Sequence, residues 1–111
     1  MENEVKELLS EAREVIAHSR NWTKNAHGRR IAYNGRSVST KATDKDAYAW
    51  DSKGSVIKAF ANLQLTNSKV LFTAFEWLDK VSGCNSIVEL DDCKNTKHAV
   101  VLAVFDKAIT N

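Results

Sequence analysis

The fold class of this 111-residue chain is decided by one stretch, Arg30-Ile31-Ala32-Tyr33-Asn34-Gly35-Arg36-Ser37-Val38-Ser39. The dipeptide Asn34-Gly35 separates two short strand-like runs, which is the strongest local signal for a β-hairpin. A type I′ turn needs positive φ at both central positions, and asparagine and glycine tolerate that conformation. The stretch therefore predicts a two-stranded antiparallel ribbon.

This turn type also predicts the strand register. Tyr33 would pair with Arg36, and Ile31 would pair with Val38. Ile31 and Val38 would then share one face and lie against the core. Because an isolated hairpin is only marginally stable in water, we expect it to lean on the rest of the chain.

Helical periodicity surrounds the hairpin on both sides. Four helices are predicted: one over residues 4–19, a second that begins after Thr43, a third over residues 68–81 and a last one from Thr96. Asn67 is a suitable cap for the third helix, and Gly54 inside the second indicates a close approach by another element. Residues 84–95 fit either a short strand or a single helical turn. The expected fold is α+β and mostly helical, with the hairpin between the first and second helices.

Composition indicates a single domain over residues 1–111. Hydrophobic residues make up 43% of the chain, enough for one compact core. No apolar run approaches the roughly 20 residues of a membrane span. The first residues are acidic, unlike a signal peptide, and Cys84 and Cys93 are too few for a disulfide framework. We therefore expect a cytoplasmic protein with free thiols and no membrane contact.

The charges are unevenly distributed. Residues 20–43 hold six basic residues and no acid, while the rest of the chain holds ten basic and fourteen acidic residues, a net charge of −4. Such a basic segment can face either an acidic protein surface or phosphate groups. The predicted partner-binding residues are Arg29, Arg30, Tyr33 and Arg36, with Trp22 in support.

The chain also resembles a family of small uncharacterised bacterial and phage proteins. The resemblance is carried by Trp22, by Asp46-Ala47 with Trp50 and Gly54, and by a C-terminal run from Ser86 to Asp92 that continues through Thr96, Val101-Leu102 and Phe105-Asp106-Lys107-Ala108-Ile109. The chain departs from the family pattern Trp-Cys-x-x-Gly-Ala at Trp50–Ser55, and from Trp-Asn-Asp at Leu90-Asp91-Asp92. The resemblance implies a shared helical fold and a bacterial or phage origin, but no activity.

Other constellations give weaker hypotheses. Glu89, Asp91 and Asp92 precede a helix and suggest carboxylate ligands for a divalent ion, although turn and capping roles explain them more simply. Cys93 and His98 do not form a triad with Asp106, which lies about 12 Å from His98 along a helix axis. His18 and His27 read as ordinary helix-end and loop histidines.

The leading hypothesis is accordingly a small non-enzymatic protein-binding or inhibitory module, of the kind a phage or mobile element uses against a host factor. Its partner would present an acidic surface. Nucleic-acid binding through the same hairpin and a divalent-metal-dependent enzyme remain as alternatives. No catalytic residues, metal ligands or cofactors are assigned, and a homodimer through Phe72, Trp77 and Tyr48 stays open.

Overall fold

The computed structural model describes residues 1–110, and its helices largely follow the apolar periodicity of the sequence. Helix α1 (Glu2–Val15) buries Val5, Leu8, Leu9 and Ala12, the stripe predicted for it. Helix α3 (Ser68–Val81) begins where expected, because the Asn67 side chain accepts a hydrogen bond of 3.0 Å from the amide of residue 69. Helix α5 (His98–Thr110) buries four residues toward α1 and α3: Val101, Val104, Phe105 and Ala108.

The segment left open by the sequence is helical. Helix α4 (Ile87–Asp92) is capped by Ser86, whose hydroxyl accepts a hydrogen bond from the amide of Glu89. Ile87 and Leu90 turn inward and join the core. A 3₁₀ turn, η1 (Ser19–Asn21), follows the first helix.

The second helix begins later than predicted. Helix α2 (Ser52–Asn62) starts at Ser52 and not after Thr43, because Asp51 is its N-cap and accepts a 2.7 Å hydrogen bond from the amide of Gly54. Trp50 is instead held in an extended conformation. Its amide donates to the carbonyl of Asn21 at 2.8 Å, and its carbonyl accepts a hydrogen bond from the amide of Thr23 at 3.0 Å. These long-range hydrogen bonds exclude a helix over the same residues.

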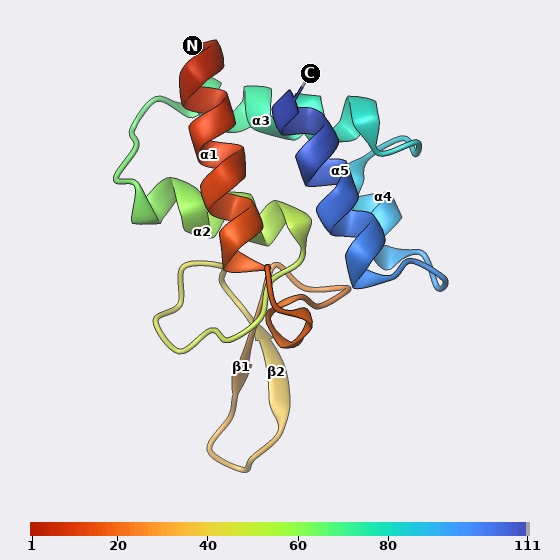
Figure 1. Ribbon diagram of the computed structural model, residues 1–111. Helices are drawn as coiled ribbons and strands as arrows, with labels where there is room; N and C mark the ends of the chain where they lie inside the picture. Colours follow the sequence, from red (N-terminus) through yellow and green to blue (C-terminus); the bar gives the residue numbers. More distant parts are fainter. Residues whose placement is uncertain (111) are drawn as a thin grey trace.

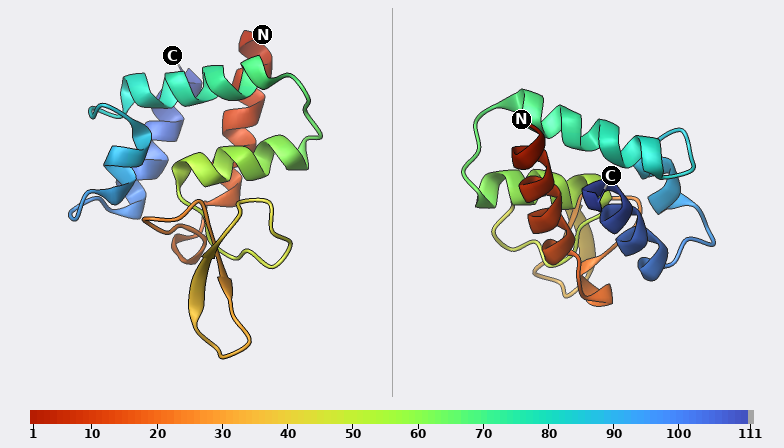
Figure 2. Two further views of the ribbon diagram at one scale, coloured as in Figure 1. Left: turned by 180° about the vertical axis from the view of Figure 1, so that it is seen from behind. Right: turned by 45° about the horizontal axis from the view of Figure 1, so that its top comes forward.

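The helices form two layers. Helices α1 and α5 lie side by side in one layer, with α2 and α3 crossing behind them (Figure 1; Figure 2, left). Helix α1 contacts all three of these partners, and α4 packs against α2 and α3 at the edge. The core lies between the layers and includes the fully buried Leu8, Leu78 and Phe105. Within residues 1–110, none of the helices is both long and apolar enough to span a membrane.

The hairpin is present between α1 and α2, but its register differs from the predicted one. Strands β1 (Gly28–Ile31) and β2 (Ser37–Thr40) are antiparallel, with Arg30 opposite Val38 and Ile31 opposite Ser37. Only Gly35 of the turn dipeptide has positive φ, at +82°. The loop is therefore a three-residue turn in which the Gly35 amide donates to the Ala32 carbonyl at 2.8 Å.

This one-residue slip changes where the strand side chains point. Ile31 and Val38 now lie on opposite faces of the ribbon, since each shift of one residue reverses the side-chain direction. The ribbon extends away from the helices (Figure 1). Ile31 is 53% exposed and Val38 is 38% exposed, so the expectation that they contact the core was wrong.

Candidate functional site

The hairpin carries most of the predicted partner-binding residues. Tyr33 stands at its tip with its side chain fully exposed, and Arg36 is exposed beside it. Arg29 is half-buried at the base of β1. Within residues 1–110 neither arginine forms an ion pair. The hairpin therefore carries an aromatic side chain and one cation at its tip and a second cation at its base, and neither cation has an acidic partner among the described residues.

Arg30 differs from its neighbours because acids of the same chain neutralise it. Its guanidinium lies 3.3 Å from a carboxylate oxygen of Asp44 and 3.6 Å from one of Asp46. The Thr40 hydroxyl, the amide of Asp46 and Arg30 together hold the pKa of Asp44 below its usual value. Arg30 thus ties the hairpin to the following loop and is less free to meet a partner than Arg36.

Trp22 lies apart from the hairpin tip, on the helical body. Its indole Nε1 donates to Oδ1 of Asp91 at 3.2 Å, and its ring is half-buried between Lys24 and His98. The ammonium of Lys24 is 5.7 Å from the ring centroid, and the imidazole of His98 is 6.0 Å away. Trp22 packs against the core and bridges to Trp50, next to the Ala49 that Arg29 bridges to, whereas Tyr33 and Arg36 are exposed at the tip of the hairpin.

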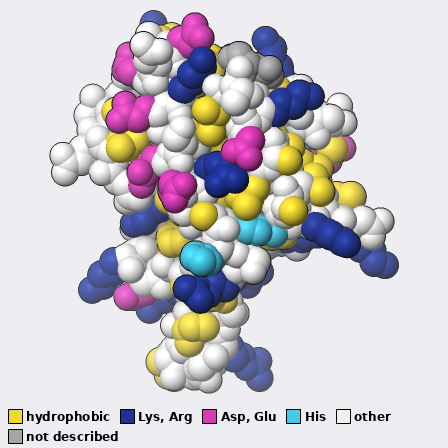
Figure 3. Space-filling model, viewed as in Figure 1, with side chains coloured by type: hydrophobic (Ala, Val, Ile, Leu, Met, Phe, Trp, Pro, Cys, Tyr) yellow, Lys and Arg dark blue, Asp and Glu magenta, His cyan; other side chains and the backbone are white. Residues whose placement is uncertain are grey.

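The charge asymmetry expected from the sequence is visible on the surface. On the face shown in Figure 3, acidic side chains gather over the helical body near α1, whereas basic side chains predominate around the base and tip of the hairpin. Helix α1 carries Glu2 and Glu4 in its first turn. The two ends of the molecule thus differ in electrostatic character.

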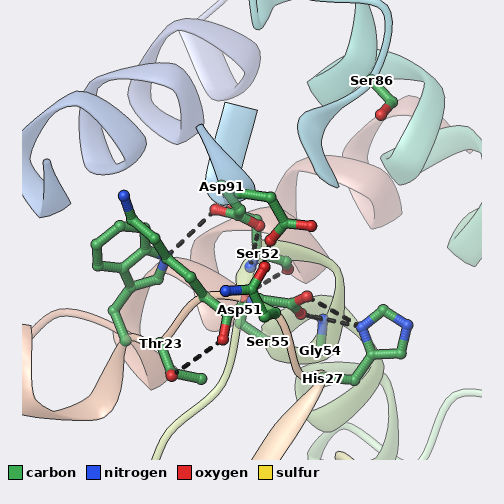
Figure 4. Close-up of polar contacts among 12 residues, drawn as sticks. Thr23, His27, Asp51, Ser52, Gly54, Ser55, Ser86 and Asp91 are labelled. Atoms are coloured by element: carbon green, nitrogen blue, oxygen red, sulfur yellow. Dashed lines mark hydrogen bonds and ion pairs between the residues drawn. The ribbon is translucent and has the colours of Figure 1, made fainter. Parts of the chain in front are cut away.

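A second cluster of polar residues lies where the hairpin meets the helices. Its centre is a pair of buried carboxylates, Asp51 and Asp91, with exposed fractions of 2% and 0% (Figure 4). Asp91 accepts three hydrogen bonds: 2.8 Å from the Ser52 amide, 2.7 Å from the Ser52 hydroxyl and 3.2 Å from the Trp22 indole. Trp22 follows η1 and Ser52 begins α2, so Asp91 joins α4 to both of these segments.

Asp51 has a different set of partners. Besides capping α2, it lies 3.1 Å from Nδ1 of His27 through each of its carboxylate oxygens. The imidazole is about half exposed, and its other nitrogen points away from the carboxylate (Figure 4). A hollow of about 430 Å³ adjoins this pair, lined by Asn25, Ala26, His27, Ser39, Asp51, Val88 and Asp92. Such an oriented imidazole can exchange a proton with a molecule in the hollow.

Burial dominates the electrostatics of both carboxylates. Desolvation raises the pKa of Asp91 to about 6, against the opposing effect of the Ser52 and Trp22 hydrogen bonds. Desolvation also raises the pKa of Asp51, and the amide of Gly54 and His27 oppose it. The charge of a neighbouring acid adds a smaller contribution in the same direction, from Asp51 on Asp91 and from Asp92 on Asp51.

The fold separates the three acidic residues of the candidate metal site, Glu89, Asp91 and Asp92. Asp91 points inward, Glu89 is exposed, and Asp92 accepts a 3.0 Å hydrogen bond from the amide of Asn25. Across the described part of the chain, no three or more histidine, cysteine, aspartate or glutamate side chains are grouped to hold a metal ion. The turn that the sequence suggested for Asp92 is thus replaced by a long-range contact.

The residues of the rejected triad also have separate partners. His98 lies 2.6 Å from the carbonyl of Ile16, and Asp106 pairs with Arg13 at 2.6 Å. Cys93 is exposed, and hydrogen bonds from the amide of Asn95 and the side chain of Thr96 lower the pKa of its thiol.

Sequence reasoning missed the roles of Asp51, Ser52 and His27. Asp51 accepts a hydrogen bond from the amide of Gly54, three residues later. An aspartate at the start of a helical segment is a local N-cap signal, and this signal could have located Asp51. His27 has no comparable signal, because its partner lies 24 residues away.

A helical body with an inserted β-hairpin and a buried aspartate pair defines the structural class of this protein. Its sequence matches the family model described as a family of unknown function, DUF6197, over residues 1–111, so the chain belongs to that family. A search of curated proteins gave no match, and a search of solved structures gave none.

Proposed function

We propose that this chain is a protein-binding module whose hairpin contacts an acidic surface on a partner protein. The observation that carries the proposal is the exposure of Tyr33, Ile31 and Val38 on a ribbon that leaves the body of the molecule. Large apolar side chains grouped on a projecting element are typical of interaction surfaces. A fully exposed tyrosine at the tip suits an anchor that fills a pocket on a partner.

The charges on the ribbon favour a partner with an acidic surface. Arg36 and Arg29 have no acid of the same molecule (residues 1–110) within ion-pair distance. Because no anion offsets the charges of Arg29 and Arg36, their electric field extends further from the surface. This field would steer an acidic surface toward the hairpin. The acidic α1 lies in the opposite part of the molecule and would disfavour the reverse orientation (Figure 3).

The apolar residues favour a protein partner over a nucleic acid. Phosphate contacts use cations and hydrogen-bond donors, and they leave aliphatic side chains without a counterpart. Ile31 and Val38 offer aliphatic surface on both faces of the ribbon. A folded partner with an apolar pocket and an acidic rim would cover both kinds of group, and occupation of that surface would inhibit or adapt the partner.

Affinity capture from the native host tests this proposal. We expect the double variant Tyr33→Ala/Arg36→Glu to lose the proteins that the wild-type bait retains, as identified by mass spectrometry. Lys107→Glu on α5 is the matched control, because it makes the same charge change on an exposed lysine away from the hairpin. This control should retain them.

Two results would contradict the proposal. Equal recovery of every protein by the wild-type and double-variant baits would remove the hairpin from recognition. Recovery of nucleic acid in place of protein, with binding that falls steeply as the salt concentration rises, would show that the partner is a nucleic acid and not a protein.

A further inference from the structure

The two edges of the hairpin differ in how their backbone groups are satisfied. The amide of Ala32 donates to the carbonyl of Arg36 at 2.8 Å, which makes this pair hydrogen-bonded. Pairs alternate along an antiparallel ladder, so Arg30 and Val38 bond to each other, while the N–H and C=O groups of Ser37 and Ser39 point outward from β2.

The outer edge of β1 is partly covered by the chain itself. The amide of Arg29 donates to the carbonyl of Ala49 at 2.9 Å, and the amide of Tyr48 donates to the carbonyl of Arg29 at 2.8 Å. This contact adds a short third segment beside β1.

The outer edge of β2 has no such cover within residues 1–110. The backbone groups of Ser37 and Ser39 make no hydrogen bond outside the strand pair. A hollow of about 430 Å³, lined by residues that include Ser39, Thr40, Lys41 and Ile57, lies at the base of this strand. The body of the molecule therefore leaves space beside β2, and the edge is open to another extended chain.

The charges that flank β2 select among the chains that could pair with it. Arg36 precedes the strand and Lys41 follows it, and both are exposed. An antiparallel second copy would place Arg36 near the copy's Lys41, and opposed like charges disfavour that pairing. An extended segment with acidic residues at both ends would instead meet a cation at each end of the strand.

We propose that β2 accepts an extended acidic segment of the partner protein by strand addition. This inference rests on the proposed function and specifies how the hairpin binds. Backbone hydrogen bonds to Ser37 and Ser39 would provide the pairing, and contacts with Arg36 and Lys41 would orient the added strand.

A proline substitution tests the backbone contribution separately from the side chains. Ser39→Pro removes the outward N–H of residue 39 and leaves the hydrogen bonds between β1 and β2 intact, since proline is tolerated at an edge whose N–H faces solvent. Ser39→Ala is the matched control, because it removes the hydroxyl and keeps the N–H. Protection of the Val38 amide from hydrogen exchange shows that the hairpin still forms in each variant.

The probe is a synthetic peptide, Glu-Thr-Val-Thr-Val-Glu, and its charge-reversed form has lysine at both ends. We expect the acidic peptide to slow amide exchange at Ser37 and Ser39 in the wild type and in Ser39→Ala. Its affinity for Ser39→Pro should fall by about tenfold, as the loss of strand hydrogen bonds requires. The lysine peptide should not bind.

Equal affinity of the acidic peptide for Ser39→Pro and Ser39→Ala would overturn strand addition, as would its failure to bind the wild type. A wild-type dimer in sedimentation that Ser39→Pro abolishes would overturn the acidic partner in favour of a second copy. Affinity capture from the native host distinguishes failure of strand addition from failure of the proposed function. Should Ser39→Pro keep the proteins that Tyr33→Ala/Arg36→Glu loses, the hairpin would bind through side chains alone and only strand addition would fail.

Discussion

Gly54 shows how a single residue position joins two parts of the fold. The backbone of residue 27 crosses α2 so closely that a Cβ added at Gly54 would lie 1.8 Å from the carbonyl oxygen of His27. This contact confirms the close approach that a glycine inside the helix indicated. It also places His27 beside Asp51, one turn earlier in the cap of the same helix.

The substitution Gly54→Ala tests this contact. Helix propensity alone would stabilise the protein by about 1 kcal/mol, because alanine is the better helix former. We expect the opposite sign, a loss of about 2–3 kcal/mol, since backbone atoms must move to admit the methyl group. Urea unfolding measures the difference. Gly35→Ala is the comparison: its φ of +82° costs about 1 kcal/mol but the site is open, so a larger loss there than at Gly54 would contradict the steric account.

At the scale of elements, the hairpin is separate from the core that stabilises the molecule. Its strands contribute no residue to the buried apolar core, and Ile31, Val38 and Tyr33 are exposed. The base of the hairpin is held differently: the Arg29 amide donates to the Ala49 carbonyl, and the Arg29 carbonyl accepts from the Tyr48 amide. The tip is therefore an appendage, while the base belongs to the framework around Asp51.

Excision of the tip tests this division. Replacing residues 31–37 by Gly-Gly should shift the midpoint of thermal unfolding by only a few degrees, because little apolar surface leaves the core. Circular dichroism would show retained helical signal. A collapse of the helical signal at room temperature would mean that the ribbon is required for folding of the body.

At the scale of the whole molecule, Asp91 joins three segments that are remote in sequence. It accepts from Trp22 in the segment after η1 and from Ser52 at the start of α2, and it belongs to α4 itself. Its carboxylate is fully buried, and burial raises its pKa from the ordinary 3.8 to about 6. The free energy of unfolding should therefore depend on pH through the titration of Asp91.

The sign of that dependence follows from proton binding. Between pH 4 and pH 6 the native state holds more protons at Asp91 than the unfolded state does, so its contribution to the free energy of unfolding falls as pH rises, by about 2 kcal/mol. Asp51, whose pKa is also raised, acts in the same direction.

Chemical unfolding of the wild type and of Asp91→Asn across this range isolates the contribution, since asparagine does not titrate. The difference between the two stabilities should change with pH in favour of the wild type under acid conditions. Parallel curves from pH 4 to pH 7 would exclude a titrating Asp91.

The sequence by itself determined α1, α3 and α5 and the presence of the hairpin. The periodicity of α1 and α5, the Asn67 cap of α3 and the Asn34-Gly35 turn are all encoded within a few neighbouring residues, where spacing and capping chemistry act locally. The exposed cations near the turn were likewise evident from the sequence.

The tertiary structure alone decided the register of the hairpin, the start of α2 and the buried polar cluster. Trp50 is extended because Asn21 and Thr23 supply its hydrogen-bond partners, and Asp91 is buried because Ser52 and Trp22 supply its donors. The physical reason is that a polar group enters a protein interior only when its partners are already there. Those partners lie 27 to 69 residues away, beyond the reach of any local pattern.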